Sequence, residues 1–351
     1  MIPLRKNIIL IVTIFLLLSL NFSNADTQPN SFKKANPNYQ LKFPRDHGEH
    51  KNFKLEWWYL TANLTSETFG DLGIQWTLFK NELRPDKKEK SWKLDAFWMA
   101  HSAITTKNNH YFEERFARMG VGTAGVSLSP FKAWIDNWSL KGKNNTLETL
   151  TLMISGENFS YHLELQTQKR PILQGNNGFS LKSESGNSSH YYSQPFYQVT
   201  GWIEIEGKKE RVKGFGWLDR EWSSDLLDKN QLGWDWFSIH LKNGDKIMLY
   251  QVRSKNESHF ISGSWINKFG VTKELSSEIV KIKFREIKKI QGIKIPVSWR
   301  IFFPEKSFNF TITPINENSF METIVPYWEG PVKVQGSFEG FGYLEMTGYF
   351  K

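Results

Sequence analysis

The stretch "GWLDREW" (216–222) threads carboxyl groups between tryptophans. If it forms a strand, Trp217, Asp219 and Glu221 share one face while Arg220 points to the other, because successive side chains alternate. A carboxyl group packed between indole rings is poorly hydrated, which raises its pKa and lets it keep a proton near neutral pH. Such a group suits general acid catalysis, and we predict Asp219 as the catalytic acid.

The reaction that this acid would support is the hydration of a carbon–carbon double bond. The acid protonates the alkene, aromatic faces stabilise the carbocation, and a base takes the proton of the water that adds. Neither a cofactor nor a metal is required. We expect a hydrophobic small molecule to be bound by the tryptophans around this acid: Trp217, Trp222, Trp234 and Trp236.

A structural role for Asp219 remains open, because an acidic residue recurs at the corresponding position of a later motif, Glu345, and either carboxyl could pair with a cation such as Arg220. Glu221 is predicted to form an ion pair with Arg220 or another arginine.

The best partners for Asp219 lie in "HYYSQP" (190–195), at the end of a polar loop. A neutral histidine is a suitable base for an attacking water, so His190 and Tyr192 are predicted to join Asp219 in catalysis. Tyr191 is expected to contact the substrate. A surface position for the loop histidine is the alternative.

Strand patterns dominate the elements that must position these residues. In "SYHLELQ" (160–166) apolar and polar residues alternate, and "GPVKVQG" (330–336) repeats the pattern. Aromatic residues make up 15% of the chain, which fits pleated surfaces. We predict an all-β protein, with one short helix over 110–120.

An internal repeat indicates two domains. "YQVTGWIEIEG" (197–207) followed by "GFGWLD" (214–219) recurs as "YWEGPVKVQG" (327–336) followed by "GFGYLE" (340–345). The starts of the halves also match, since "EWWYLTANL" (56–64) resembles "DWFSIHL" (235–241). We infer a duplicated β-domain, with domains over 41–222 and 223–351 and their boundary within 222–233.

Several long motifs resemble the AttH-like exported proteins grouped with carotenoid 1,2-hydratase, also called hydroxyneurosporene synthase. They are "FPRDHGEHKNFKLEWWYLTANL" (43–64), "HYYSQP" (190–195), "GFGWLDREWSS" (214–224), "GWDWFSIHLKNGDKIMLYQVR" (233–253), "YWEG" (327–330) and "GYLEMTGY" (342–349). The resemblance implies two tandem lipocalin-like antiparallel β-barrel domains. It also implies that the aromatic-x-Asp element carries the acid of a hydratase.

Other polar residues are interpreted within this barrel picture. "DHGEH" (46–50) suggests metal ligands, but the glycine and the extended segment after it do not offer a rigid ligand helix, so no metal site is predicted. The segment is expected to cross the first barrel, with charged contacts near Glu56. Trp58, Gln75 and His101 are expected to face inward and contact the ligand.

The beginning of the chain reads as an export signal. Arg5 and Lys6 precede an uncharged run over 8–20 that is too short for a membrane span, and Ala25 ends a cleavage-site pattern. We predict a signal peptide over 1–25, a flexible leader over 26–40, and an exported protein, periplasmic or secreted, with no membrane span after cleavage. Retention of the signal as an anchor is the alternative.

Three functional hypotheses remain. The first is a cofactor-independent hydro-lyase acting on an isoprenoid or polyene-like substrate. The second is a periplasmic carrier of a lipid or other hydrophobic ligand, and the third is a glycosidase or other hydrolase. Despite a net charge of +9, the basic residues are scattered, which argues against nucleic acid as a partner. No nucleophile elbow, P-loop or dinucleotide fingerprint is present.

Overall fold

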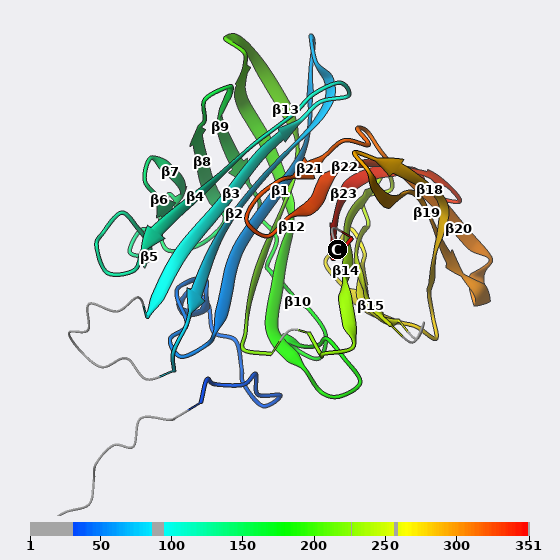
Figure 1. Ribbon diagram of the computed structural model, residues 1–351, viewed down its shortest axis with the longest axis horizontal. Helices are drawn as coiled ribbons and strands as arrows, with labels where there is room; N and C mark the ends of the chain where they lie inside the picture. Colours follow the sequence, from blue (N-terminus) through cyan, green and yellow to red (C-terminus); the bar gives the residue numbers. More distant parts are fainter. Residues whose placement is uncertain (1–30, 86–94, 226, 256–258, 350–351) are drawn as a thin grey trace, which may run out of the picture.

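A computed structural model describes residues 31–85, 95–225, 227–255 and 259–349 (Figure 1). The predicted signal peptide lies outside the described residues. Within the described ranges, no helix is long and apolar enough to cross a membrane.

The first domain is one antiparallel sheet that curls into a barrel. Its strand order is β4-β3-β2-β1-β13-β12-β9-β8-β7-β6-β5, with β10 and β11 paired to β12. A single turn of 3₁₀ helix, η1 (Arg45–His47), precedes it. The strands are β1 (Leu55–Ser66), β2 (Gly70–Glu82), β3 (Ala96–Thr105), β4 (His110–Arg118), β5 (Ala124–Leu128), β6 (Phe131–Ile135), β7 (Trp138–Gly142), β8 (Thr149–Ser155), β9 (Phe159–Gln166), β10 (Ile172–Leu173), β11 (Phe179–Leu181), β12 (Ser188–Ile205) and β13 (Lys208–Ser223).

The second domain is a separate antiparallel sheet that forms a more open half-barrel (Figure 1). Its order is β17-β16-β15-β14-β23-β22-β20-β19-β18, with β21 paired to β22. The elements are β14 (Gln231–Leu241), β15 (Lys246–Ser254), β16 (Phe260–Ile266), β17 (Thr272–Ser276), β18 (Lys281–Ile290), β19 (Ile293–Phe303), η2 (Pro304–Lys306), β20 (Phe308–Pro314), β21 (Phe320–Met321), β22 (Tyr327–Gly336) and β23 (Gly340–Thr347). The prediction of an all-β protein with two lipocalin-like domains is confirmed.

The predicted helix over 110–120 is wrong, because residues 110–118 form β4. Its residues pair in register with β3, from Thr105↔His110 to Phe97↔Arg118. Backbone pairing with a neighbouring strand therefore overrides the weak helical pattern of "HYFEERFARMG".

The repeat is visible in the strand order. In the first sheet β13 lies between β1 and β12, and in the second β23 lies between β14 and β22. Asp219 pairs with Tyr59, and its counterpart Glu345 pairs with Trp236. This register aligns Tyr59 with Trp236. The sequence match between 56–64 and 235–241 differs from this structural alignment by two residues. An even offset keeps the same side chains on the same face of the strand.

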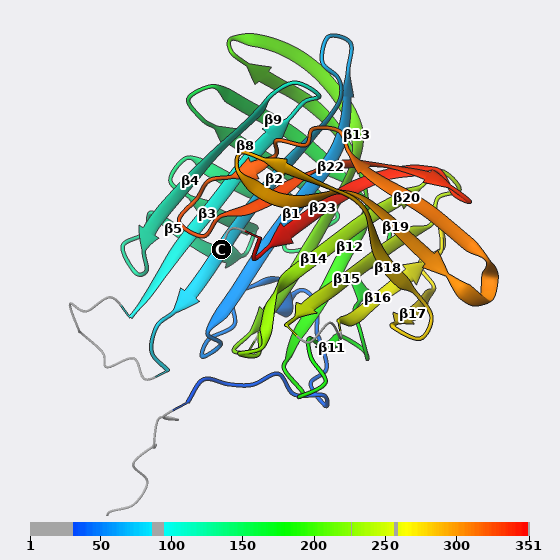
Figure 2. The ribbon, with the colours of Figure 1, turned by 45° about the vertical axis from the view of Figure 1, so that its right-hand side comes forward.

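Three apolar clusters hold the domains together. One fills the first barrel and a second fills the half-barrel. A third cluster lies between the domains and includes Tyr59, Tyr191 and Trp217 of the first domain and Trp236 and Tyr343 of the second. Strand β1 packs against β23 and β2 against β22, so the domains lie side by side (Figure 2).

The chain before β1 crosses one end of the first barrel. Within the range interpreted as a flexible leader, the Asn36 backbone N–H donates to His190 Nε2 at 3.2 Å. The Tyr39 ring lies 4.6 Å from that of His190 and meets the edge of Trp222. Residues 36–39 therefore cover part of the barrel core.

Candidate functional site

A pocket of about 280 Å³ lies between the two domains. That is just below the ~300–1,000 Å³ typical of small-molecule sites, which often form at domain interfaces. Eight side chains of Trp, Tyr and Phe line it: Trp57, Tyr59, Phe79, Tyr191, Trp234, Trp236, Tyr250 and Tyr327. Ionisable side chains also face it: His101, Lys182, Asp219, Glu221 and Glu345.

Strand β13 presents its two faces to different surroundings, as predicted from the alternation. Asp219 and Glu221 face the pocket, and Trp217 belongs to the interdomain cluster. Leu218 belongs to the core of the first barrel, where Arg220 is also fully buried. The strand therefore separates a site on its outer face from a packed core on its inner face.

The Asp219 carboxyl accepts three hydrogen bonds. Tyr191 donates to Oδ2 at 2.5 Å, Ser193 to Oδ1 at 2.5 Å, and the Trp217 indole to Oδ1 at 2.7 Å. Burial raises the pKa of Asp219 to about 7 although these bonds oppose the rise, and the Glu221 charge adds to it. Asp219 therefore exchanges a proton near neutral pH, as a general acid requires.

Glu345 places a second carboxyl in the same pocket. The Trp234 indole donates to its Oε1 at 2.5 Å. Burial raises the pKa of Glu345 to about 7, with contributions from the charges of Glu221 and Asp219. Equivalent positions of the two repeats thus meet at one site.

Lys182 is the cation of the pocket that pairs with Glu221. Its Nζ lies 2.7 Å from Glu221 Oε1 and above the rings of Tyr191 and Tyr250. Burial lowers the pKa of Lys182, but the charges and hydrogen bonds of Glu221 and Tyr250 together outweigh this and raise it above its usual value. The predicted pair between Glu221 and an arginine is therefore corrected to Lys182.

His101 faces the second domain rather than the inside of the first barrel. Strand β3 turns it toward the pocket, where Nδ1 lies 2.8 Å from the Tyr327 hydroxyl. Gln75 also lies on the outer face of its strand, but it is buried against Thr77 and does not line the pocket. Gln75 and His101 were both predicted to face inward, but both lie on the opposite face of the sheet, and of the two only His101 lines the pocket.

His190 and Tyr192 do not lie beside Asp219. In β12 they alternate with Tyr191 and Ser193, so they point into the first barrel. The His190 ring packs against Trp222 at 5.4 Å, and burial lowers the pKa of His190 to about 4. Tyr191 and Ser193 point outward and lie beside Asp219, in the positions that were predicted for His190 and Tyr192.

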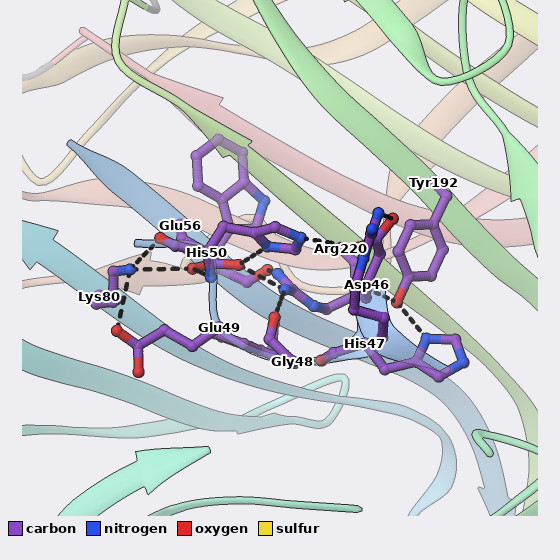
Figure 3. Close-up of polar contacts among 12 residues, drawn as sticks. Asp46, His47, Gly48, Glu49, His50, Glu56, Lys80, Tyr192 and Arg220 are labelled. Atoms are coloured by element: carbon purple, nitrogen blue, oxygen red, sulfur yellow. Dashed lines mark hydrogen bonds and ion pairs between the residues drawn. The ribbon is translucent and has the colours of Figure 1, made fainter. Parts of the chain in front are cut away.

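Trp58 and Trp222 are likewise inside the first barrel, together with a buried network of charged residues (Figure 3). Arg220 stacks on Trp58 at 3.7 Å and donates to Glu56 Oε1 at 2.6 Å. Arg220, the ion-pair partner considered for Asp219 in a structural role, is thus paired with Glu56 instead.

The segment 46–50 belongs to this network, as expected from its placement near Glu56. His50 Nδ1 lies 2.6 Å from Glu56 Oε1, and Lys80 Nζ lies 3.3 Å from Glu56 Oε2. Asp46 bonds Arg45 and the Lys42 N–H. In the described part of the chain, no group of three or more His, Cys, Asp or Glu residues is arranged to hold a metal ion.

The pocket residues missed in the sequence come from strands β1, β2 and β3 of the first domain, from the second domain and from loops. Lys182, Tyr250 and Tyr327 carry no local signal. Glu345 does carry one, because it repeats Asp219, and the repeat by itself leaves a structural role and a role in the site both open.

The fold and the pocket define a protein of two lipocalin-like domains with a pocket between them. Residues 34–349 match the AttH-like family model, and the chain belongs to this family. A provisionally named AttH protein from Nitrosomonas europaea, known from a crystal structure, is 30% identical in sequence to this chain. The match covers 91% of this chain and 100% of that protein's chain, with a TM-score of 0.82.

Kievitone hydratase from Nectria haematococca has the same fold at a TM-score of 0.68, with 13% identity over 92% of this chain and 97% of that one. No curated protein sequence matches the chain.

Proposed function

We propose that the protein is a cofactor-independent hydratase that acts on an apolar substrate in the interdomain pocket. The observation that carries this proposal is Asp219, a buried carboxyl with a pKa of about 7 that faces a pocket lined by aromatic rings. The resemblance to carotenoid 1,2-hydratase and the fold shared with kievitone hydratase support it.

The proposed reaction begins with a proton transfer. The alkene π electrons form a carbon–hydrogen bond with the Asp219 proton, which leaves a carbocation and an aspartate. Tyr191, Ser193 and Trp217 already point hydrogens at this carboxyl, so they stabilise the charge that develops on it. Trp236 and its neighbours stabilise the cation, and water completes the addition.

The pocket volume bears on the substrate. At about 280 Å³, it is slightly smaller than the ~300 Å³ at which small-molecule sites usually begin. This space suits the end of an isoprenoid chain rather than a whole polyene. A longer substrate would extend out of the pocket past Leu227 and Val325, two apolar lining residues that are also exposed.

The experiment is an assay in heavy-oxygen water with isoprenoid alkenols of increasing length, from prenol to geranylgeraniol. A hydrated product that carries the heavy oxygen supports the proposal, provided that Asp219→Asn abolishes it. Tight binding without product would instead identify a carrier, and release of reducing sugar from glycans would identify a glycosidase.

Export is proposed on the N-terminal pattern alone. N-terminal sequencing of protein from the host should return Asp26 in a soluble fraction. A protein that keeps Met1 and stays with the membranes would contradict it.

A further inference from the structure

Three side chains from both domains form a line of hydrogen bonds at the pocket. His101 Nε2 lies 3.0 Å from Glu114 Oε1, and His101 Nδ1 lies 2.8 Å from the Tyr327 hydroxyl. Glu114 belongs to β4, His101 to β3 and Tyr327 to β22. His101 and Tyr327 line the pocket, whereas Glu114 stands behind them with its side chain 17% exposed.

The neighbours of His101 determine its tautomer. A carboxylate only accepts hydrogen bonds, so the Nε2 that faces Glu114 carries a hydrogen. Burial lowers the pKa of His101, with Glu114 opposing, so the ring is neutral near pH 7 and Nδ1 has a free lone pair. The Tyr327 hydroxyl must then donate to Nδ1.

Tyr327 keeps its own proton in the resting protein. Burial and the nearby carboxyls of Glu329 and Glu345 raise the pKa of Tyr327 well above its usual value. Burial and Glu345 also raise the pKa of Glu329 well above its usual range, and the Tyr59 hydroxyl donates to this carboxyl. The Tyr327 hydroxyl can also hydrogen-bond the Glu329 carboxyl. A neutral carboxyl is a weaker acceptor than a carboxylate, so His101 Nδ1, at 2.8 Å, is the favoured acceptor of the Tyr327 hydrogen.

We propose that Tyr327, backed by His101 and Glu114, is the base that takes the proton of the attacking water. Hydroxyl, imidazole and carboxylate stand in the order found in hydrolytic triads, in which the last group holds the imidazole in its tautomer and stabilises the imidazolium. This inference rests on the proposed hydratase function and supplies the base that His190, inside the first barrel, does not.

The proton transfers balance. The water oxygen bonds to the carbocation, the water proton passes to the Tyr327 oxygen, and the original Tyr327 proton passes to His101 Nδ1. Glu114 stabilises the imidazolium until it loses this proton to solvent, and Asp219 regains one proton. The sum is one alkene and one water converted to one alcohol.

Glu345 is the competing base, because it is a carboxyl in the same pocket. A proton transfer to Glu345 would leave the Tyr327 hydroxyl without a role in hydration. Variants at these two positions therefore separate the alternatives.

The first test follows deuterium in heavy water, with the alkenol that the wild-type protein hydrates fastest as probe. The Tyr327→Phe protein should form alcohol ~10²-fold or more slowly, yet still exchange deuterium into recovered alkene within a few fold of wild type. This split is expected because the Asp219 step remains and the cation loses a proton back to Asp219. Asp219→Asn should lose both reactions. Wild-type alcohol formation by Tyr327→Phe, or the same split in Glu345→Gln alone, would overturn the inference.

The second test needs no substrate. Nitrogen NMR of the His101 ring, assigned with His101→Gln, should show a neutral ring protonated at Nε2, and Tyr327→Phe should remove the hydrogen-bond shift at Nδ1. A ring protonated at Nδ1, or doubly protonated at pH 7, cannot take the Tyr327 proton and would overturn the inference. Failure of the wild-type protein to hydrate or exchange any alkenol would reject the proposed function instead, and the tautomer would still decide whether this unit accepts a proton.

Discussion

Asp219 and Glu345 occupy equivalent positions in the two repeats, and both side chains line the pocket between the domains. Each is held by an indole N–H, from Trp217 and Trp234 respectively. The duplicated strand thus contributes one titratable carboxyl from each domain. Glu345→Gln is therefore a variant of the site itself, and it cannot serve as a purely structural control for Asp219.

The stability of Asp219→Asn should depend on pH in a definite direction. The pKa of Asp219 rises from 3.8 to about 7 on folding, so the folded state binds the proton more tightly than the unfolded state does. The resulting stabilisation of the fold is fully present below pH ~4 and is lost as pH rises through about 7. Because Asn does not ionise, the melting temperature of the variant minus that of wild type should increase between pH 5 and pH 8. The full effect is roughly 4 kcal/mol for a shift of this size, as an upper bound.

Thermal melts at the two pH values provide the measurement. A variant that loses several degrees at pH 8 but not at pH 5 would show that the Asp219 charge stabilises the fold, as an ion-paired residue does.

The pH dependence of hydration should follow the same group. Turnover should fall above about pH 7 as Asp219 ionises, because only the protonated acid transfers a proton. Glu221→Gln removes a negative charge that raises the pKa of Asp219 and leaves Lys182 unpaired nearby. The pH at which turnover falls should therefore be lower in Glu221→Gln than in the wild-type protein. A fall that stays at the same pH or moves to higher pH would contradict this electrostatic coupling.

The fold and part of the site could be predicted from local sequence, but the choice of face on β12 could not. The three residues of "HYY" cannot share one face of a strand, and the register with β13 decides which of them meet Asp219. An irregularity between Gln194 and Tyr197 shifts that register, so counting back from the hairpin turn leads to the wrong face.

Tyr327 and Glu345 reach the pocket only through docking of the two domains. No local pattern encodes that arrangement. Asp219 and Trp236 were predictable because the density of indoles around a carboxyl is itself a local feature of the chain.

Arg220 should be a stability residue. Arg220→Met would leave Glu56 buried and remove donors from the carbonyls of Gly48 and Trp57, so a loss of ~3–5 kcal/mol in unfolding free energy is expected. The double variant with Glu56→Gln should lose less than the sum of the single losses. Urea unfolding measures both.

The matched control is Asp225→Asn, which breaks an exposed pair with Lys34 and should cost at most ~1 kcal/mol. A loss at Arg220 as small as this one would show that the buried network contributes little.

Gly73 should control how closely the domains approach. A Cβ at this position would lie 2.7 Å from a Tyr343 ring carbon and 2.8 Å from Pro331. Gly73→Val should therefore force β2 and β22 apart, lower the melting temperature and weaken ligand binding in the pocket. The comparison is Gly70→Asn on the same strand, where φ is +65° and a side chain meets no neighbouring atom. Equal effects of the two variants would contradict a close contact at Gly73.

The most direct test of the central claim compares turnover and ligand affinity in Asp219→Asn and Asp235→Asn. Asp235 is an equally buried aspartate outside the pocket, paired with Arg253 at 3.1 Å, and its pKa is raised by burial to about 6. Asp219→Asn should lose ~10²–10⁴-fold in turnover with nearly unchanged affinity, whereas Asp235→Asn should keep its turnover. An Asp219→Asn protein that hydrates the substrate at the wild-type rate would show that this carboxyl is not the acid.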